Sequence, residues 1–119
     1  MNKRKVKEYI LDYIKRNPET TFIEIEEVFK KLKFNYKGKG VYCSGESEKV
    51  IFWADWNKKA FDVVSELKRD GYVIMNVVSP TVYLLEGKTL DLPVMKTIKD
   101  LKQDCWIPVT FTAIYTKAA

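Results

Sequence analysis

Histidine is absent from this chain of 119 residues. Histidine is a common general base and metal ligand, so its absence excludes Ser-His-Asp triads, imidazole acid–base chemistry and zinc sites built on histidine. The remaining residues show no nucleophile–base pair and no cluster with metal-ligand spacing. We therefore expect a protein that is not an enzyme and that needs no cofactor.

Cysteines and long apolar runs are scarce as well. Cys43 and Cys105 lie 62 positions apart, without metal-ligand spacing, and fit reduced thiols of a cytoplasmic protein. No apolar run approaches the roughly 18 residues of a membrane span. The basic residues 1–5 lead into an amphipathic segment, so we expect no secretory signal. These absences predict a cytoplasmic protein without membrane contact.

The residues that are present have the composition of one globular domain. Hydrophobic residues make up 46% and charged residues 31%, which is ordinary for a globular chain that buries a core without disulfides or a metal. The net charge of +5 fits nucleic acid or another acidic surface as the partner. Solubility alone explains that charge equally well.

Two amphipathic helices are expected near the N-terminus. Apolar residues at helical spacing predict a first helix over residues 3–16, which Asn17-Pro18 ends. Thr21 and Glu24 make a capping box, which predicts a second helix to about Lys33. The buried face of the second helix would consist of Phe22, Ile25, Val28, Phe29 and Leu32.

A short hairpin and a third helix are expected next. Residues 41–44 and 49–53 have the pattern of two strands around a turn at residues 45–48. The third helix would run from about Trp56 to Arg69, with Asp55 as its N-cap and Gly71 as its left-handed end. Its inward positions are Trp56, Ala60, Val63, Val64 and Leu67.

The segment after the third helix predicts a second hairpin. Residues 72–78 and 81–85 are rich in β-branched and aromatic side chains, and Ser79-Pro80 joins them. A helix that leads into a hairpin after two earlier helices is typical of a winged helix-turn-helix domain. Residues 107–115 alternate between apolar and polar, which predicts a half-buried strand that Pro108 places at a sheet edge.

The fold prediction is therefore α+β and winged helix-turn-helix-like. It comprises three helices with a wing hairpin, an extra hairpin between the second and third helices, and a C-terminal edge strand. We expect a single domain over residues 1–119, with a core at about 3–88 and an extension at 89–119. The structure of residues 89–106 stays open.

The third helix carries the first candidate contacts with nucleic acid. Lysine and arginine bind phosphates or guanine edges, and a short serine permits close approach to a groove. Three acidic residues nearly balance four basic ones between 56 and 70, which is more typical of a solvated face. The wing tip at residues 76–81 has no basic residue, which weakens a DNA interpretation. The candidates are Lys58, Lys59, Ser65 and Arg69.

Two basic clusters supply the other candidates. Residues 1–16 hold six basic and two acidic side chains, and residues 30–39 hold five lysines and no acid. Tyr36 and Tyr42 lie in or near the second cluster, where aromatic rings among lysines can stack on single-stranded bases. A helix end favoured by its dipole, followed by a soluble loop, is a somewhat better explanation of the same charges. The candidates are Lys3, Arg4, Lys37 and Lys39.

Trp53 and Trp56 stand close together before the third helix. Aromatic side chains dominate core burial, so we favour a role as core anchors. The alternative is an exposed hot spot for a partner protein.

Six short segments, spread over about residues 20–110, carry a resemblance. They are Ile25-Glu26-Glu27-Val28-Phe29, Phe34-Asn35-Tyr36-Lys37-Gly38, Phe52-Trp53-Ala54-Asp55-Trp56-Asn57, Tyr83-Leu84-Leu85-Glu86-Gly87-Lys88, Leu92-Pro93 and Trp106-Ile107-Pro108-Val109. In these segments the chain resembles small uncharacterised proteins encoded by phages and pathogenicity islands of Gram-positive bacteria. The resemblance implies a mobile-element origin and a cytoplasmic, accessory role, and it brings no catalytic residue.

Two functional hypotheses follow. The first is a winged-helix DNA-binding protein that serves regulation or replication of a mobile element, with the third helix in the major groove. The second is a protein-interaction module that binds and modulates a host or phage protein, which the near-neutral third helix and the uncharged wing favour. The preferred DNA sequence or strandedness, the protein partner and the oligomeric state, a homodimer included, stay open.

Overall fold

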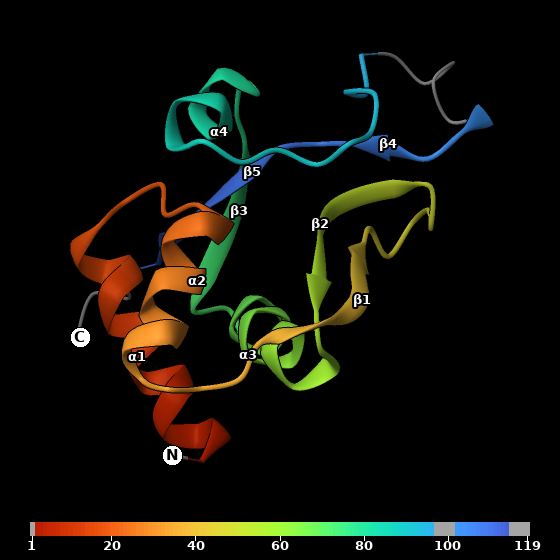
Figure 1. Cartoon of the computed structure of the whole chain (residues 1–119). Coiled ribbons are helices and arrows are strands. Elements are labelled where there is room, and N and C mark those ends of the chain that lie inside the picture. Colours follow the sequence, from red (N-terminus) through yellow and green to blue (C-terminus); the bar gives the residue numbers. More distant parts are fainter. Residues whose placement is uncertain (1, 97–101, 115–119) are drawn as a thin grey trace.

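The computed structural model describes residues 2–96 and 102–114 and has an α+β fold. Within those residues it contains four helices, a three-stranded sheet and a two-stranded sheet, with the helices α1 and α2 side by side and α3 below the strands (Figure 1). The elements in chain order are α1 (Lys3–Arg16), α2 (Phe22–Lys31), β1 (Lys37–Cys43), β2 (Val50–Trp56), α3 (Lys58–Arg69), β3 (Val73–Val77), α4 (Thr81–Glu86), β4 (Cys105–Trp106) and β5 (Val109–Ala113).

The helix starts are set by side-chain caps. The predicted span of α1 is confirmed, and so is the capping box of α2, in which the Thr21 hydroxyl accepts from the Glu24 amide and the Glu24 carboxylate accepts from the Thr21 amide. The predicted start of α3 is wrong. Asp55 and Trp56 belong to β2, and the Asn57 side chain caps α3 by accepting from the Ala60 amide at 2.9 Å.

The predicted extra hairpin is present as β1 and β2. These strands pair antiparallel, and β4 joins the far side of β2 in parallel. Lys37 and Gly40 both lie opposite Trp56, so the intervening residues bulge out of the ladder. A side chain at Gly40 would bring its Cβ within 2.6 Å of the Trp56 carbonyl oxygen. This glycine therefore lets the start of β1 lie directly against the junction of β2 and α3.

The predicted wing hairpin is wrong. Residues 81–86 form the helix α4, and β3 pairs antiparallel with β5, from Val73 opposite Ala113 to Val77 opposite Val109. Pro80 has φ −58° and suits the start of a helix, and the Ser79 hydroxyl accepts from the Thr81 amide. Tertiary packing then overrides the strand propensity of this segment, because the α4 helix buries the ring of Tyr83.

The buried Tyr83 connects three parts of the chain. Its hydroxyl donates to the Val109 carbonyl at 2.6 Å and accepts from the Phe22 amide at 3.1 Å. Burial raises the pKa of the Tyr83 hydroxyl. The first turn of α2, the helix α4 and the strand β5 therefore meet at one side chain, which fixes α4 over the end of the two-stranded sheet.

The core is dominated by aromatic rings. Trp53, Trp56 and Trp106 are fully buried or nearly so, which confirms Trp53 and Trp56 as core anchors. The Phe22 ring stacks on Trp53 at 5.5 Å. The predicted inward stripes are confirmed for Phe22, Ile25 and Phe29 of α2 and for Ala60, Val63, Val64 and Leu67 of α3, whereas Val28 and Leu32 are half-buried.

A carboxylate that sequence reasoning missed lies inside this core. Glu26 of α2 is only 4% exposed. Its Oε2 accepts from the indole nitrogens of Trp53, at 3.0 Å, and Trp56, at 2.8 Å. The ammonium of Lys88 donates to both carboxylate oxygens at 3.0 and 3.1 Å. The signal available in the sequence was the helical spacing, which places residue 26 next to the buried positions 22, 25 and 29.

The C-terminal strand is confirmed as β5, in a two-stranded sheet where both strands are edges; Tyr115, in the predicted strand, lies outside the described residues. Cys43 and Cys105 are both described, and no disulfide joins them. No helix within residues 2–96 and 102–114 has the length and apolar character needed to cross a bilayer.

Candidate nucleic-acid interface

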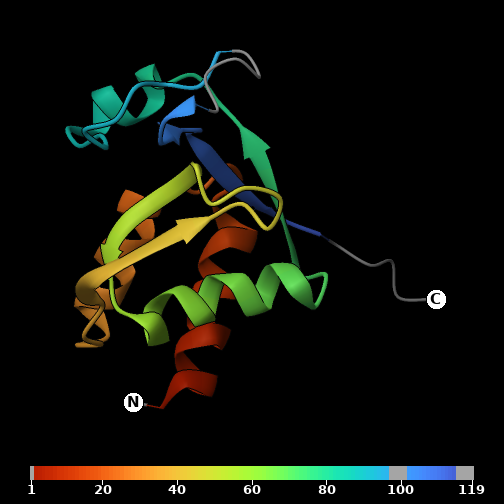
Figure 2. The same cartoon turned by 90° about the vertical axis from the view of Figure 1, so that its right-hand side faces the viewer.

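Six of the eight predicted contact residues gather at one end of the molecule. They come from the start of α1, the start of β1 and the first turn of α3, which lie in the lower half of both views, toward the N-terminus (Figures 1 and 2), and Lys3, Lys58 and Lys59 line one hollow. The Asn57 amide group donates to the carbonyl oxygens of Asn35, at 2.8 Å, and Lys37, at 3.4 Å, so the basic segment at residues 30–39 is tied to the start of α3. We call these six the basic end: Lys3, Arg4, Lys37, Lys39, Lys58 and Lys59.

Three of the six charges have an ion-pair partner. Lys3 binds Glu66 at 2.7 Å, Lys58 binds Asp62 at 2.9 Å, and Arg4 lies 3.8 Å from Glu8. The remaining three form no ion pair within the described residues and are exposed. They are Lys37, Lys39 and Lys59. The basic end therefore keeps uncompensated positive charge on β1 and α3.

Ser65 and Arg69 lie apart from the basic end. Arg69 stands at the C-terminal end of α3, about 15 Å along the helix from Lys59, and donates to Asp70 at 3.0 and 3.3 Å. The Ser65 hydroxyl is half-buried and faces a hollow shared with Tyr42 and Cys43 of β1. The outward residues of α3 therefore do not act as one cationic surface.

The two tyrosines predicted to stack on bases are occupied by the fold. Tyr36 is 7% exposed and packs on Phe29 and Trp56. Tyr42 packs edge-on against Phe22 and Phe52, and burial raises the pKa of its hydroxyl. The partly exposed aromatic ring near the lysines is instead Phe34. The sequence offered no way to rank these rings, because the choice depends on which one the core takes up.

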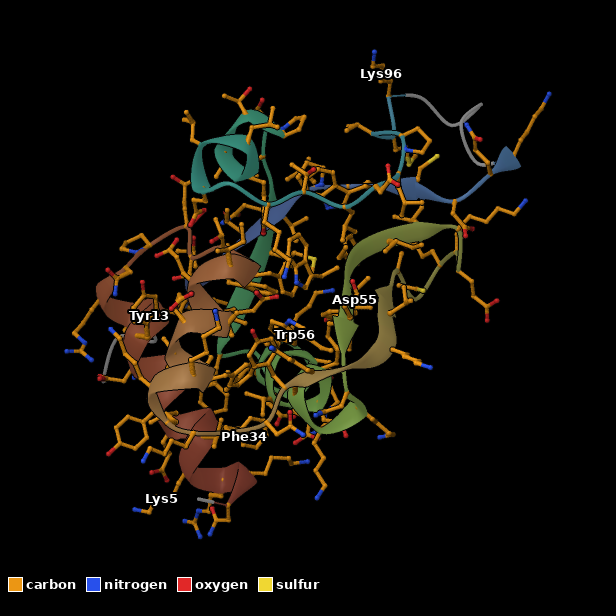
Figure 3. The ribbon with its side chains drawn as sticks, in the orientation of Figure 1. Lys5, Tyr13, Phe34, Asp55, Trp56 and Lys96 are labelled. Carbon is orange, nitrogen blue, oxygen red and sulfur yellow. The ribbon has the colours of Figure 1, made fainter. Side chains whose placement is uncertain are left out.

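A hollow of about 570 Å³ lies within the basic end. Its walls come from the start of α1, the loop before β1 and the first turns of α3. The residues that line it are Asn2, Lys3, Phe34, Lys58, Lys59 and Asp62. Figure 3 shows Phe34 toward the end where α1 begins, and Trp56 in the interior. This arrangement combines an aromatic surface with three ammonium groups and one carboxylate.

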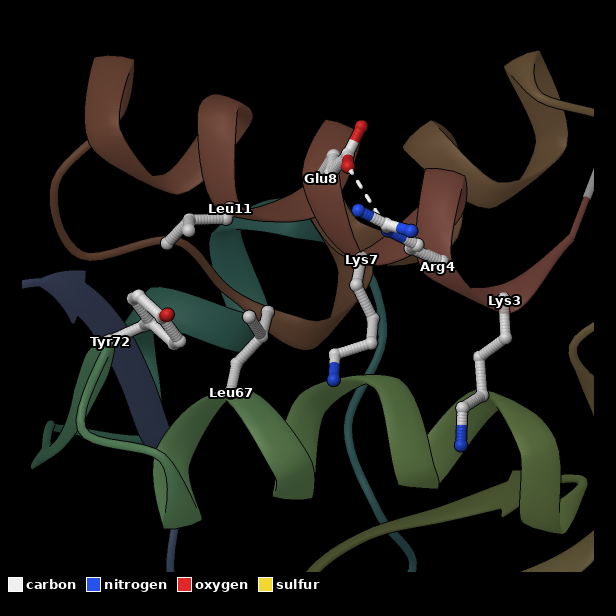
Figure 4. A pocket seen from close by; sticks show the side chains of 7 residues that line it. All are labelled: Lys3, Arg4, Lys7, Glu8, Leu11, Leu67 and Tyr72. Atoms are coloured by element: carbon white, nitrogen blue, oxygen red, sulfur yellow. Dashed lines mark ion pairs between the residues drawn. The ribbon is translucent and has the colours of Figure 1, made fainter.

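A second hollow of about 320 Å³ separates α1 from the C-terminal half of α3 (Figure 4). Lys3 and Lys7 extend from α1 toward α3 and donate to the two oxygens of Glu66, at 2.7 and 3.1 Å. These hydrogen bonds lower the pKa of the Glu66 carboxyl from its ordinary 4.5 to about 2. Glu66 therefore joins the two helices and compensates charge beside the basic end.

Glu66 is expected to make stability depend on pH in acid. A carboxyl whose pKa is lowered by folding stabilises the folded state above pH 4.5, and that contribution is lost as the pH falls through about 2. Because the side chain is 20% exposed, we expect Glu66→Gln to cost about 1 kcal/mol at pH 7. Urea unfolding at several pH values should show the two proteins converging below pH 4.5. A constant difference down to pH 2 would contradict this role.

A third hollow, of about 570 Å³, is an apolar cleft between the β1–β2 turn and β3. Its apolar lining includes Phe52, Met75 and Val77, and Lys68 and Glu46 also line it. The bonds from Val78 to Pro108 and from Ile114 to Tyr72 show that even-numbered residues of β3 bond to β5. The backbone groups of Val73, Met75 and Val77 therefore point away from β5. Val77 is 74% exposed at this open edge.

Comparisons with known protein families, with curated proteins and with solved structures found no match to this chain. The resemblance to proteins of phages and pathogenicity islands therefore stays a prediction, and the interface rests on the geometry described above.

Proposed function

We propose that this protein binds DNA without catalysing a reaction, and that the basic end holds the phosphate backbone. The observation that carries the proposal is the gathering of cations from three separate segments, with Lys37, Lys39 and Lys59 unpaired within the described residues. Neutralised phosphates release condensed counterions, which is the main source of non-specific affinity for DNA. The resemblance to mobile-element proteins supports an accessory role on such DNA, in the cytoplasm.

The helix starts at the basic end add to this argument. Neither α1 nor α3 has an acidic residue in its first turn. Instead α1 begins with Lys3 and Arg4, and α3 begins with Lys58 and Lys59. Positive side chains are unfavourable at the positive end of a helix dipole, by about 0.3–1 kcal/mol each. A bound anion removes that penalty, because helix N-termini and ammonium groups both attract phosphate.

The proposed contact differs from that of a winged helix. No hairpin follows α3 within residues 70–96 and 102–114, and Asp62, Glu66 and Asp70 offset the cations along α3. A near-neutral helix is poorly suited to read base edges in a major groove. We therefore expect the basic end to bind the backbone with little dependence on base sequence.

Salt dependence tests the proposal. Fluorescence anisotropy with labelled oligonucleotides of mixed sequence should give a linear fall of log affinity with log salt, from about 25 to 200 mM NaCl. Three to four neutralised phosphates predict a slope of about −3 on duplex and slightly less on single strands. A mixture of scrambled sequences is the control for base preference. An absence of binding at about 25 mM, or an affinity independent of salt, would overturn the proposal.

A second candidate function is the binding of a host or phage protein. The observation that favours it is the apolar cleft beside the open edge of β3, where Val77 is exposed and an extended peptide can add a strand. The salt titration separates the two candidates. If the protein shows no affinity for DNA at low salt, the apolar cleft is the better-supported binding surface.

A further inference from the structure

The hollow at the basic end has the parts of a base-binding site. Phe34 is half-buried, with its ring tilted by 37° against Phe29 at 5.1 Å, and it lines the hollow. Packing on Phe29 orients the ring and leaves part of it in the hollow. Aromatic rings that are held in place by the core stack on bases of any sequence.

Three lysines from two helix starts line the same hollow as this ring. Lys58 and Lys59 come from the first turn of α3, and Lys3, whose ammonium also binds Glu66 at 2.7 Å, comes from the first turn of α1. The hollow also contains the Asp62 carboxylate, which binds Lys58 at 2.9 Å. Asp62 repels phosphate but can accept a hydrogen bond from the amino group of a base. A base inside the hollow with its phosphates on the lysines matches both signs of charge.

The size of the hollow and the cost of unpairing favour an unpaired base. Its volume of about 570 Å³ lies in the range of about 300–1,000 Å³ that small-molecule pockets occupy. In a duplex the bases are stacked and paired, and bringing one into a hollow costs a few kcal/mol. A single strand presents its bases without that cost.

We propose that the preferred ligand is single-stranded nucleic acid, with one base stacked on Phe34 and the adjacent phosphates on Lys3, Lys58 and Lys59. This inference rests on the proposed function, since it uses the same cations. It goes further by naming the strandedness and by assigning a role to Phe34. Phosphate contacts alone do not favour a single strand over a duplex of the same charge.

The experiment compares Phe34→Leu with the wild type on a single-stranded DNA of about 20 nucleotides and on a duplex of that length. The wild type is expected to bind the single strand more tightly. Phe34→Leu should weaken single-strand binding by about 5- to 100-fold, the usual effect of losing a stacked base, with the salt slope unchanged. Duplex binding should change by less than about twofold. Tyr72→Leu, an exposed aromatic residue beyond the hollow, is the matched control.

A second measurement guards against a folding defect in Phe34→Leu. A single strand of the same length with abasic sites keeps the phosphates but has no bases to stack. The wild type should bind the abasic strand more weakly than the normal strand, by about the factor that Phe34→Leu loses on the normal strand. The Phe34→Leu variant should bind the two strands with nearly equal affinity. Phe34→Trp should restore single-strand affinity.

The outcomes separate the inference from the proposed function. Equal weakening on single strand and duplex, or equal affinity of the wild type for normal and abasic strands, overturns the stacking inference and leaves backbone binding in place. No binding of either DNA at low salt overturns both.

Discussion

Glu26→Ala is expected to lower the free energy of unfolding by about 2–6 kcal/mol, because two buried indole N–H groups lose their acceptor at about 1–3 kcal/mol each. The Glu26 carboxylate is the acceptor for the indole N–H groups of Trp53 and Trp56. Both indoles are fully buried, so water cannot replace the lost acceptor without entering the core. The ammonium of Lys88, 5.5 Å from the centre of the Trp53 ring, would also lose its partner.

The measurement is urea unfolding followed by tryptophan fluorescence, since two of the reporters contact the mutated side chain. Typical domains have about 5–15 kcal/mol of stability, so Glu26→Ala threatens folding outright. Glu26→Gln keeps an acceptor oxygen and is expected to give a smaller loss that can be measured if the alanine variant does not fold. A loss of less than about 1 kcal/mol for Glu26→Ala would contradict this role.

Lys88→Met provides the matched control. The Lys88 side chain is 47% exposed and Glu26 keeps both indole donors, so Lys88→Met is expected to cost less than the loss of Glu26, about 1–3 kcal/mol for a buried carboxylate left without its cation. A double-mutant cycle with Glu26→Gln isolates the coupling between the two residues. We expect most of the effect of Glu26 to survive in the Lys88→Met background, because the indole bonds do not involve the lysine.

The second large effect is expected from the basic end. Replacing Lys37, Lys39, Lys58 and Lys59 together by glutamine should weaken DNA binding on the order of 100-fold at low salt. It should also remove most of the salt dependence, making the slope shallower by about 2, since each lost phosphate contact contributes about 0.7–0.9 and Lys3 and Arg4 remain. Anisotropy titrations of the same oligonucleotides measure both quantities. Unchanged affinity would show that the cations of the basic end are a solvated surface.

The control variant removes the same charge elsewhere. Glutamine at Lys15, Lys49, Lys68 and Lys102 also changes the net charge from +5 to +1, because four positive charges are lost in each variant. We expect at most a few-fold loss of affinity for this control. Folding should be preserved in the basic-end variant, since losing the Lys58–Asp62 pair is offset by the relief of positive charge at the start of α3. An equal loss in both variants would indicate net charge alone.

Elements that depend on neighbours along the chain were predictable. The helix α1 follows from the spacing of its apolar residues, and the start of α2 follows from Thr21 and Glu24. The inward stripe of α3 and its end at Gly71, where φ is +81°, follow from the same kind of local pattern. In each case the residues that determine the structure lie within about four positions of one another.

Elements that depend on partners far away in the chain were not predictable from the sequence. Residues 81–86 have strand-like composition but form α4, because Tyr83 is buried against Phe22 and Val109. Strand β3 finds its partner in β5 rather than in the next segment of the chain. The N-cap of α3 is Asn57 and not the predicted Asp55, because β2 continues to Trp56, where it pairs with β1.

The candidate interface shows the same division. The charge, the lack of histidine and the aromatic core anchors can be predicted from single residues or short patterns. These properties belong to the side chains themselves and do not depend on long-range packing. Long-range packing decides which charges and rings come together. It places Lys3 beside Lys58 and ties Lys37 to the start of α3 through Asn57. It also buries Tyr36 and leaves Phe34 as the ring near the lysines. Charges far apart in the chain act together only after the core has brought their helices and strands side by side.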